Sequence, residues 1–341
     1  MAGIKELKTR IKSIGSTRKI TRAMQMVSAA KMRKAKQAAL NSRTYSSLAW
    51  ELINNLTGGT GGVIPSVSEG SLSVNEVPNS SDSSSDALLG MTHLLKSFPN
   101  ASKTGVIIIS TNKGLVGGFN ANLMNVARPL LGSEEVMAEL LVMGRKAKDF
   151  ALRFNKNLIA DFPKSDTWVS INSIYPLAKM VSDLYQTGEY KNISIIYSQF
   201  VSTLVQKATI KQLLPFTDVL PNSQDKNLEL ENEVVDDNNE GGIFSKKVSE
   251  ENNIMESEYL FEPSPEIVLN NLLPRIIESQ IYQAVLESDA SEHSARMVMM
   301  KNATEAAGDI IEDLTLTYNG LRQSKITTEL SEITAGRIAL E

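Results

Sequence analysis

Two segments at the ends of the chain lack helix breakers over unusual lengths, and they constrain the fold more than any motif does. Residues 2–56 contain no Pro and only two glycines, Gly3 and Gly15; residues 275–341 also contain no Pro, and their glycines stand singly. At 1.5 Å per residue, helices of these lengths would extend about 80 Å and about 100 Å, several times the usual helix. Such helices must protrude from a domain of this size.

Apolar side chains recur in both segments at alternating intervals of three and four residues, which is the spacing of a coiled coil. In the first segment they are Ile4, Leu7, Ile11 and Ile14 and then, after Gly15 and Ser16, Ile20, Met24 and Val27. In the second they are Ile311, Leu314, Tyr318 and Leu321, then Ile326, Leu330 and Ile333, with Arg337 and Leu340 at the end. Because each stripe is narrow and interrupted by small or polar residues, we expect the two helices to wrap around one another and to be enclosed by something else. Two amphipathic helices packed on an ordinary core are the alternative.

The formal charge of −4 conceals a strong asymmetry. Residues 1–43 carry twelve Lys or Arg and one Glu, a balance of +11, whereas residues 275–341 carry six basic and eleven acidic residues, a balance of −5. The two segments would therefore complement each other in an antiparallel pair. A basic helix also suits nucleic acid. No aromatic residues are interleaved with these charges, however, so a helix that faces solvent or another protein is the preferred interpretation.

The middle of the chain alternates between short apolar runs and helical spacing, as in a doubly wound, Rossmann-like α/β sheet. The predicted strands are residues 105–110, 139–143 and 192–200, and the predicted helices are residues 119–131, 145–154 and 173–185. Residues 58–90 are rich in Gly and Ser, and residues 222–258 hold eleven acidic and three basic residues. Both of these segments are predicted to be loops, because they are too polar to fold alone.

The chain lacks the common signatures of an active site, a cofactor site or a metal site. Residues 110–118 place glycines between a strand and a helix, where backbone amides could hold a phosphate, but the G-x-x-G-G spacing matches neither nucleotide-binding pattern. A structural turn is therefore predicted there. The chain has no Cys, His93 and His293 lie 200 residues apart, and the longest aliphatic run is 106–109. We expect no catalysis, cofactor, metal or membrane-spanning segment in this chain.

Ordered motifs along the chain carry a family resemblance. They are residues 1–6 (MAGIKE), 17–27 (TRKITRAMQMV), 30–33 (AKMR), 110–120 (STNKGLVGGFN), 278–280 (ESQ), 294–297 (SARM), 318–319 (YN), 322–323 (RQ) and 326–336 (ITTELSEITAG). Together they resemble the gamma subunit of F-type ATP synthases, the central rotor shaft, in its bacterial form. The resemblance spans the chain except for its two inserts.

The resemblance implies a non-catalytic rotor subunit that couples proton-driven rotation of a membrane c ring to ATP synthesis in a ring of three alpha and three beta subunits. It implies an antiparallel coiled coil of the terminal helices, with an α/β domain at the foot beside the epsilon subunit and the c ring. It also implies a peripheral location on the cytoplasmic face of a bacterial inner membrane. A free-standing coiled-coil adaptor and a basic nucleic-acid-binding protein are the alternatives.

The resemblance also assigns roles to particular residues. Coupling to the alpha/beta ring is carried over to Met24, Arg296, Gln323, Thr327 and Glu329; contact of the foot with the c ring and epsilon to Tyr259, Phe261 and Glu262; and the tip bearing to Arg337, Ile338 and Leu340. Plain helix surface, helix packing or a packed corner are the alternative interpretations. Arg337 departs from the family, which usually has a small residue there.

The predicted organisation has five parts. They are a shaft helix at 1–57, a Gly/Ser-rich insert and linker at 58–104, an α/β foot domain at 105–221, an acidic insert at 222–258 and a second shaft helix at 259–341. Pro274 lies within the last part and predicts a kink or a restart of the helix. The second helix is the longer one, so its C-terminal turns are expected to extend past Met1 as a single helix.

Overall fold

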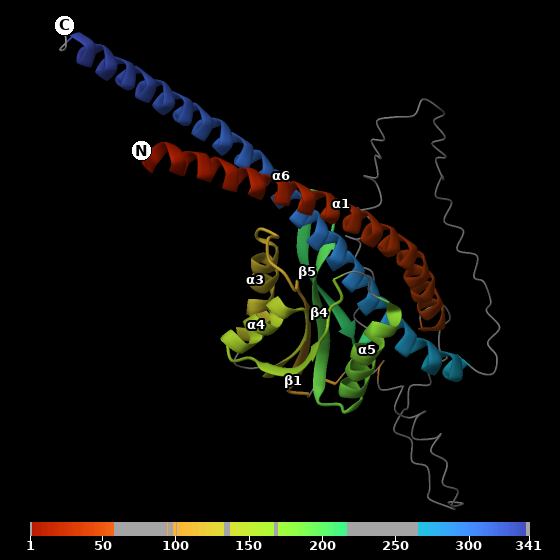
Figure 1. Cartoon of the computed structure of the whole chain (residues 1–341). Helices are drawn as coiled ribbons and strands as arrows, with labels where there is room; N and C mark the ends of the chain where they lie inside the picture. Colours follow the sequence, from red (N-terminus) through yellow and green to blue (C-terminus); the bar gives the residue numbers. More distant parts are fainter. Residues whose placement is uncertain are drawn as a thin grey trace, which may run out of the picture.

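A computed structural model describes residues 2–57, 94, 98–99, 101–132, 137–166, 170–216 and 265–338, and it combines a small α/β domain with two long helices (Figure 1). Its elements are α1 (Ala2–Thr57), β1 (Lys103–Ile109), α3 (Phe119–Gly132), β2 (Met137–Met143), α4 (Arg145–Arg153), β3 (Asn157–Phe162), α5 (Ile171–Gln186), β4 (Tyr190–Phe200), β5 (Gln206–Leu214) and α6 (Pro265–Ile338). The predicted acidic insert at 222–258 and most of the predicted insert at 58–104 lie outside the described residues.

The sheet has five strands in the order β3-β2-β1-β4-β5. Strands β1 to β4 are parallel, and β5 pairs antiparallel with β4. The chain winds outward from β1 through β2 to β3 and then crosses back to β4 on the other side of β1. This reversal is the mark of a doubly wound sheet, so the predicted Rossmann-like fold class is confirmed.

Alternate residues of the central strands build two separate cores. Val106 and Ile108 of β1 pack with α3 and α4 on one face, whereas Ile107 and Ile109 pack with α5 and α6 on the other. The side-chain period of two makes this division possible, and it explains why the central strands read as continuous apolar runs. The α6 helix thus belongs both to the domain core and to the long helix pair (Figure 1).

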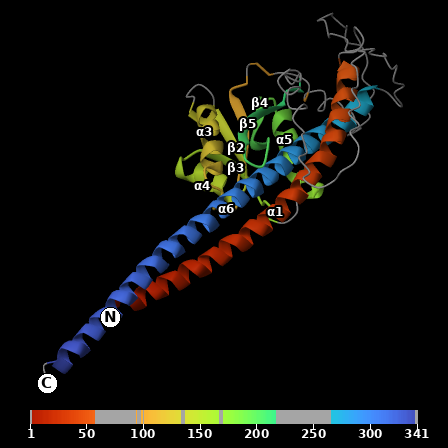
Figure 2. The same ribbon diagram turned by 90° about the horizontal axis from the view of Figure 1, so that it is seen from above.

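The two long helices run antiparallel and form the most extensive contact between any two elements (Figure 2). α1 has 56 residues and α6 has 74 residues. Neither Gly15 nor Pro274 ends a helix. α6 runs from Pro265 through Pro274 as one helix, so of the predicted kink or restart at Pro274 the restart is wrong. Residues 259–264 of the predicted part at 259–341 lie outside the described residues.

The sheet contains two strands that the sequence pattern did not predict, β3 and β5. Both are edge strands: β3 is largely half-exposed, and β5 carries Lys207 and Lys211, a feature that discourages edge-to-edge pairing with other chains. Part of the predicted linker before residue 105 also packs on the domain. Leu94 is fully buried there, and Phe98 meets Tyr185 edge-on at 5.5 Å between ring centroids.

Candidate coupling surface

The contact between α1 and α6 is a seam whose positions are spaced by three and four residues, except for one interval of seven between Ile14 and Thr21. On α1 the seam follows a subset of the buried or half-buried positions: Ile4, Leu7, Ile11, Ile14, Thr21, Gln25, Ser28, Met32, Ala35, Ala39 and Ser42. On α6 they are Met297, Met300, Thr304, Ala307, Ile311, Leu314 and Tyr318. Only the end of the seam near the N-terminus of α1 is strongly apolar, because small and polar side chains occupy most of the other positions. The predicted coiled coil is therefore present, with largely small and polar side chains beyond its apolar end.

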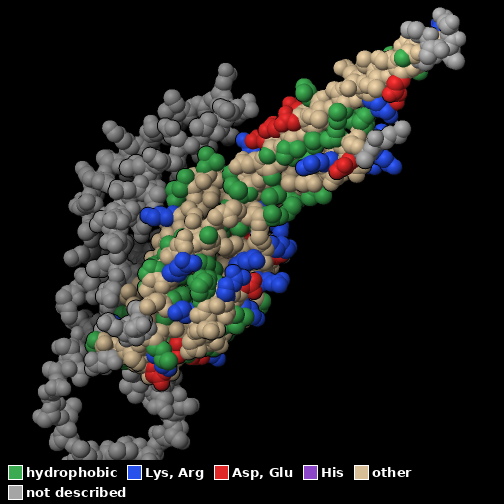
Figure 3. Space-filling model, turned by 90° about the vertical axis from the view of Figure 1, so that its left-hand side faces the viewer, with side chains coloured by type: hydrophobic (Ala, Val, Ile, Leu, Met, Phe, Trp, Pro, Cys, Tyr) green, Lys and Arg blue, Asp and Glu red, His purple; other side chains and the backbone are tan. Residues whose placement is uncertain are grey.

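On α1 the observed seam differs from the stripe that was predicted from the apolar residues alone. Ile20 is 60% exposed and Val27 is 56% exposed, whereas Met24 is half-buried beside the seam. The prediction that Ile20 and Val27 continue the seam is wrong, because the helix pair keeps its register by burying Thr21, Gln25 and Ser28 instead. Apolar side chains are left on the outer face of α1 (Figure 3).

Two close approaches fix the level at which the helices pair. The hydroxyl oxygens of Thr21 and Thr304 lie 2.8 Å apart. The Arg18 guanidinium covers Gly308, where an added Cβ would lie 3.4 Å from the Arg18 Cζ atom. In an antiparallel pair this level sets the N-terminus of α1 opposite Gln323. About 15 residues of α6, roughly 22 Å, therefore extend past α1. We call residues 324–338 the overhang, and both views show it as a single helix (Figures 1 and 2).

The polar residues proposed for coupling lie at and beyond the start of the overhang. Gln323, Thr327 and Glu329 are all exposed. The Thr327 hydroxyl donates to the Gln323 carbonyl at 3.0 Å, and Lys325 pairs with Glu329 at 3.4 Å. An exposed pair of this kind contributes little to stability. These side chains are therefore free to exchange their partners at low cost.

The overhang also carries apolar side chains that no described part of the chain covers. Ile326 is 45% exposed, Leu330 is 60% exposed and Ile333 is 69% exposed, and they continue the predicted stripe. Arg337 is exposed, Ile338 is the last residue of α6, and Leu340 lies outside the described residues. The expected single-helix tip is thus present up to Ile338.

The remaining predicted site residues do not join this group. Arg296 lies 27 residues before Gln323 on α6, about 40 Å along the helix, and its exposed fraction is 9%. Its guanidinium donates to Glu292 at 2.8 Å and contacts the His293 ring at 3.3 Å. Tyr259, Phe261 and Glu262 lie outside the described residues. The predicted coupling residues therefore lie in at least two separate parts of the molecule.

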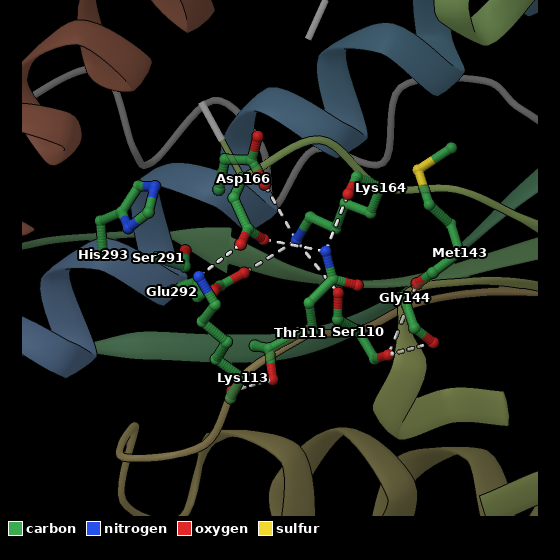
Figure 4. Close-up of polar contacts among 12 residues, drawn as sticks. Ser110, Thr111, Lys113, Met143, Gly144, Lys164, Asp166, Ser291, Glu292 and His293 are labelled. Carbon is green, nitrogen blue, oxygen red and sulfur yellow. Dashed lines mark hydrogen bonds and ion pairs between the residues drawn. The ribbon is translucent and has the colours of Figure 1, made fainter. Parts of the chain in front are cut away.

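Arg296 belongs to a buried ionic cluster that the sequence did not predict. The cluster consists of Lys164, Asp289, Glu292 and Arg296. Lys164 follows β3, its side chain is 2% exposed, and its Nζ atom lies 2.9 Å from a carboxylate oxygen of Asp289 and 2.9 Å from one of Glu292. The same atom donates to the Ser110 carbonyl at 3.0 Å (Figure 4). Asp289 and Glu292, three residues apart, lie on one helix face, and this spacing was the only signal in the sequence.

Burial and the charges of the ionic cluster shift the pKa values of Lys164, Asp289, Glu292 and the adjacent His293. Burial opposes the charge of Lys164, but Asp289 and Glu292 outweigh it and raise the pKa of the lysine. Burial also opposes the charge of Glu292, yet Lys164 and Arg296 hold its pKa below the ordinary value. Burial raises the pKa of Asp289, and burial lowers the pKa of His293 to about 4. At neutral pH the adjacent imidazole of His293 is therefore neutral.

The glycine-containing turn at 110–118 is held by its own side chains and by α6. The Thr111 hydroxyl donates to the Lys113 carbonyl at 2.8 Å, and Asn120 donates to that hydroxyl at 2.8 Å. Gly117 has φ +58°, and a Cβ there would lie 2.9 Å from the sulfur of Met299. The positive φ therefore favours glycine at this position, where the Met299 side chain of α6 packs closely over it. These contacts support the predicted structural turn over a phosphate site.

The first turn of α4, the nearest alternative place for an anion, is already capped. The Ser110 hydroxyl accepts from the Ala147 amide at 2.8 Å, and the Asn112 side chain accepts from the Arg145 amide at 3.3 Å. No group of three His, Cys, Asp or Glu that could hold a metal ion occurs among the described residues. Within the same residues, no helix offers a stretch long and apolar enough to span a membrane.

Comparison with known proteins gives consistent matches along the whole chain. A family model described as ATP synthase matches residues 3–340. The chain is 35% identical to the ATP synthase gamma chain of Pelotomaculum thermopropionicum, over 100% of both chains. It is 36% identical to that of Roseiflexus castenholzii, over 100% of this chain and 99% of the relative, and 35% identical to that of Haemophilus influenzae, over 100% of both.

Solved structures share the fold. A chain in the cryo-EM structure of the Euglena gracilis mitochondrial ATP synthase, comprising OSCP, F1 and the c-ring, superimposes with a TM-score of 0.56 at 18% identity. The alignment covers 99% of this chain and 95% of the Euglena chain. A second Euglena structure, of the rotor, gives a TM-score of 0.53 at 18% identity. At such identities the similarity concerns the fold alone.

Proposed function

The chain belongs to the ATP synthase gamma chain family, and from that membership we propose that it is the central rotor shaft of an F-type ATP synthase. In this role it catalyses no reaction itself. Rotation of a membrane c ring driven by protons turns the shaft, and the shaft drives ATP synthesis in its partners. We place it on the cytoplasmic face of a bacterial inner membrane, held there through the complex.

The overhang is the single observation that supports this function most strongly. Leu330 and Ile333 are 60% and 69% exposed on a helix that stands beyond its partner helix. Exposed apolar side chains in such a stripe favour an occupant that removes them from water. A collar of alpha and beta subunits around the helix would do so, and Arg337, Ile338 and Leu340 would form its bearing. The positive charge of Arg337 is compatible with the C-terminal end of a helix.

Coupling follows from the asymmetry of the helix pair. A shaft of two helices at one level and one helix at the next presents different side chains in different directions. In a collar of three alpha and three beta subunits, each catalytic subunit would meet a different face and would be biased toward a different affinity for nucleotide. Gln323, Thr327 and Glu329 are suited to this interface, because polar contacts there can be exchanged as the shaft turns. Met24 lies lower on the pair, and Arg296 supports the shaft internally.

The α/β domain would form the foot. We propose that it meets the epsilon subunit and the c ring, with Tyr259, Phe261 and Glu262 in the segment that approaches the ring. The exposed basic side chains of α1, including Lys8, Arg10 and Lys12, then face protein partners rather than nucleic acid.

Reconstitution with the partner subunits tests the proposal. We expect the chain to bind a mixture of the alpha and beta subunits of its own organism, and the assembled complex to hydrolyse ATP faster than the mixture alone. The double change Leu330→Glu and Ile333→Glu should weaken binding by tenfold or more, because carrying the two charges into an apolar collar costs about 1.4 kcal/mol or more in total. Affinity is measured by titration of a labelled chain.

The matched control is Leu152→Glu. Leu152 is also 60% exposed, but it lies on α4 of the α/β domain, far from the overhang. Equal loss of affinity for both variants would contradict the collar, and retention of full affinity by the double variant would do the same. A chain that remains alone, or that binds DNA or RNA with a steep salt dependence, would instead support the adaptor or the nucleic-acid alternative.

A further inference from the structure

One short loop of the α/β domain contacts both long helices. It consists of residues 163–166, between β3 and α5, and we call it the clasp loop. Lys164 reaches α6, and the Asp166 carbonyl accepts from Lys31 of α1 at 2.7 Å. We propose that the clasp loop transmits torque between the α/β domain and the helix pair, with Lys164 as the positioning residue. This inference rests on the proposed rotor function.

The contact with α6 has a fixed geometry and is shielded from water. The Nζ atom of Lys164 has three oxygen partners at 2.9 to 3.0 Å, from Asp289, Glu292 and the carbonyl of Ser110. The lysine side chain is 2% exposed and that of Glu292 is 9% exposed. Figure 4 shows the lysine between the helix and the end of β1. It therefore ties the sheet itself, and not only a surface loop, to the shaft.

The contact of the clasp loop with α1 is also supported by residues of the sheet, in the turn that follows β1. Asn112 donates to the Lys164 carbonyl at 2.7 Å and to an Asp166 carboxylate oxygen at 2.9 Å. Lys113 pairs with the other carboxylate oxygen of Asp166 at 2.7 Å. The turn after β1 thus holds the clasp loop, and the clasp loop holds Lys31. Both shaft helices are connected to the central strand through four residues of chain.

Apolar packing alone would make a softer connection. The core between the sheet and α6 includes Ile277, Ile281 and Val285, and such contact has little directional preference, so it resists separation more than it resists sliding. Displacement of α6 by a single residue would take Asp289 and Glu292 away from Lys164 and leave buried charges without partners, which is strongly unfavourable. The ionic cluster therefore resists the relative twist that torque would produce.

The test uses the complete ATP synthase in phospholipid vesicles, with ATP-driven proton uptake and ATP hydrolysis measured on the same sample. For Lys164→Met we expect hydrolysis to persist while the protons moved per ATP fall about threefold or more. Lys164→Arg, which keeps the charge, should recover part of that loss. A role only in folding would lower the amount of complex, and both rates together, and would leave their ratio unchanged.

The matched control is Lys148→Met. Lys148 pairs with Asp161 at 2.8 Å within the α/β domain, and its half-exposed ion pair includes no residue of either long helix. The control should keep the wild-type ratio. If Lys164→Met does not assemble, Asp289→Asn gives the same test with a smaller expected loss, because Glu292 still neutralises the lysine.

The outcomes separate this inference from the proposed function. The clasp would be refuted, and the rotor function left intact, if the wild-type complex is coupled and the assembled Lys164 and Asp289 variants move as many protons per ATP as the wild type. The rotor function, and the clasp with it, would be refuted if a fully assembled complex took up protons equally well with and without this chain.

Discussion

Gly114 and Gly117 lie in one turn but under different constraints. Gly117 has φ +58° and faces the Met299 sulfur, whereas an added Cβ at Gly114 would meet nothing within 4 Å. We expect Gly117→Ala to lower the free energy of unfolding by about 1–2 kcal/mol, mainly through backbone strain, since the Met299 side chain can shift. Gly114→Ala should stay within about 0.5 kcal/mol of the wild type.

Urea unfolding of the purified chain, followed by circular dichroism, measures both variants. Equal losses for the two glycines would contradict the account of the turn, and so would a larger loss at Gly114.

His293 makes the stability of the chain sensitive to mild acid. Burial, together with the positive charges of Arg296, Lys31 and Lys164, lowers its pKa to about 4 from an ordinary value of 6.5, against the opposing charge of Glu292. Below pH 6.5 the His293 imidazole therefore binds a proton in the unfolded chain, whereas in the folded chain it stays neutral until the pH approaches 4. The free energy of unfolding should fall by about 2 kcal/mol between pH 7.5 and pH 5 through this group.

The variant His293→Gln isolates that contribution. It should flatten the pH dependence of unfolding over this window by about the same amount. The carboxylate of Glu292 does not interfere, because its lowered pKa keeps it charged until the pH falls below its ordinary value of 4.5. An unchanged pH profile would show that His293 does not carry the effect.

The residues of the candidate site differ in how far the sequence could identify them. Gln323, Thr327 and Glu329 could be assigned because they lie in the motifs at 322–323 and 326–336 that carry the family resemblance, and their role in coupling stays a prediction. Lys164 was missed because its partners are contributed by a helix about 125 residues away. No local pattern distinguishes a lysine that meets buried carboxylates from one in solvent, and only the folded arrangement brings the three charges together.

At the scale of elements, the helix pair shows why a stripe of apolar residues is an imperfect guide. Periodicity identified both helices and their pairing correctly. Within the pair, register outweighs hydrophobicity, so Ser28 is buried while Val27 is 56% exposed. The same limit applies to β3 and β5, whose edge positions leave them half-exposed and without a clear apolar run.

The matched pair Ile14→Ser and Ile20→Ser tests this register. Ile14 lies half-buried in the seam, whereas Ile20 is 60% exposed outside it. Ile14→Ser should lower the stability of the helix pair by about 1–2 kcal/mol, and Ile20→Ser should change it by less than about 0.5 kcal/mol. Hydrogen exchange of the α1 amides measures both. A larger effect of Ile20→Ser than of Ile14→Ser would contradict the observed register and support the seam through Ile20 that the sequence predicted.

At the scale of the whole molecule, the chain joins a compact domain to a stiff helix pair with an exposed tip. The tip offers apolar side chains to partners, and the clasp loop ties the domain to both helices. The sequence predicted this layout because long runs without helix breakers leave few alternatives. The connection between the two parts could not be predicted in the same way, because it depends on contacts between distant segments.

Observation of rotation tests the central claim most directly. The chain has no Cys, so Lys207→Cys, an exposed position on β5, gives this chain one attachment point for a bead on the α/β domain. The alpha and beta subunits are fixed to a surface and ATP is added. The account predicts that the bead turns continuously in one direction and stops when ATP is removed. Continued ATP hydrolysis by the assembled complex, with a bead that only fluctuates about one position, would contradict it.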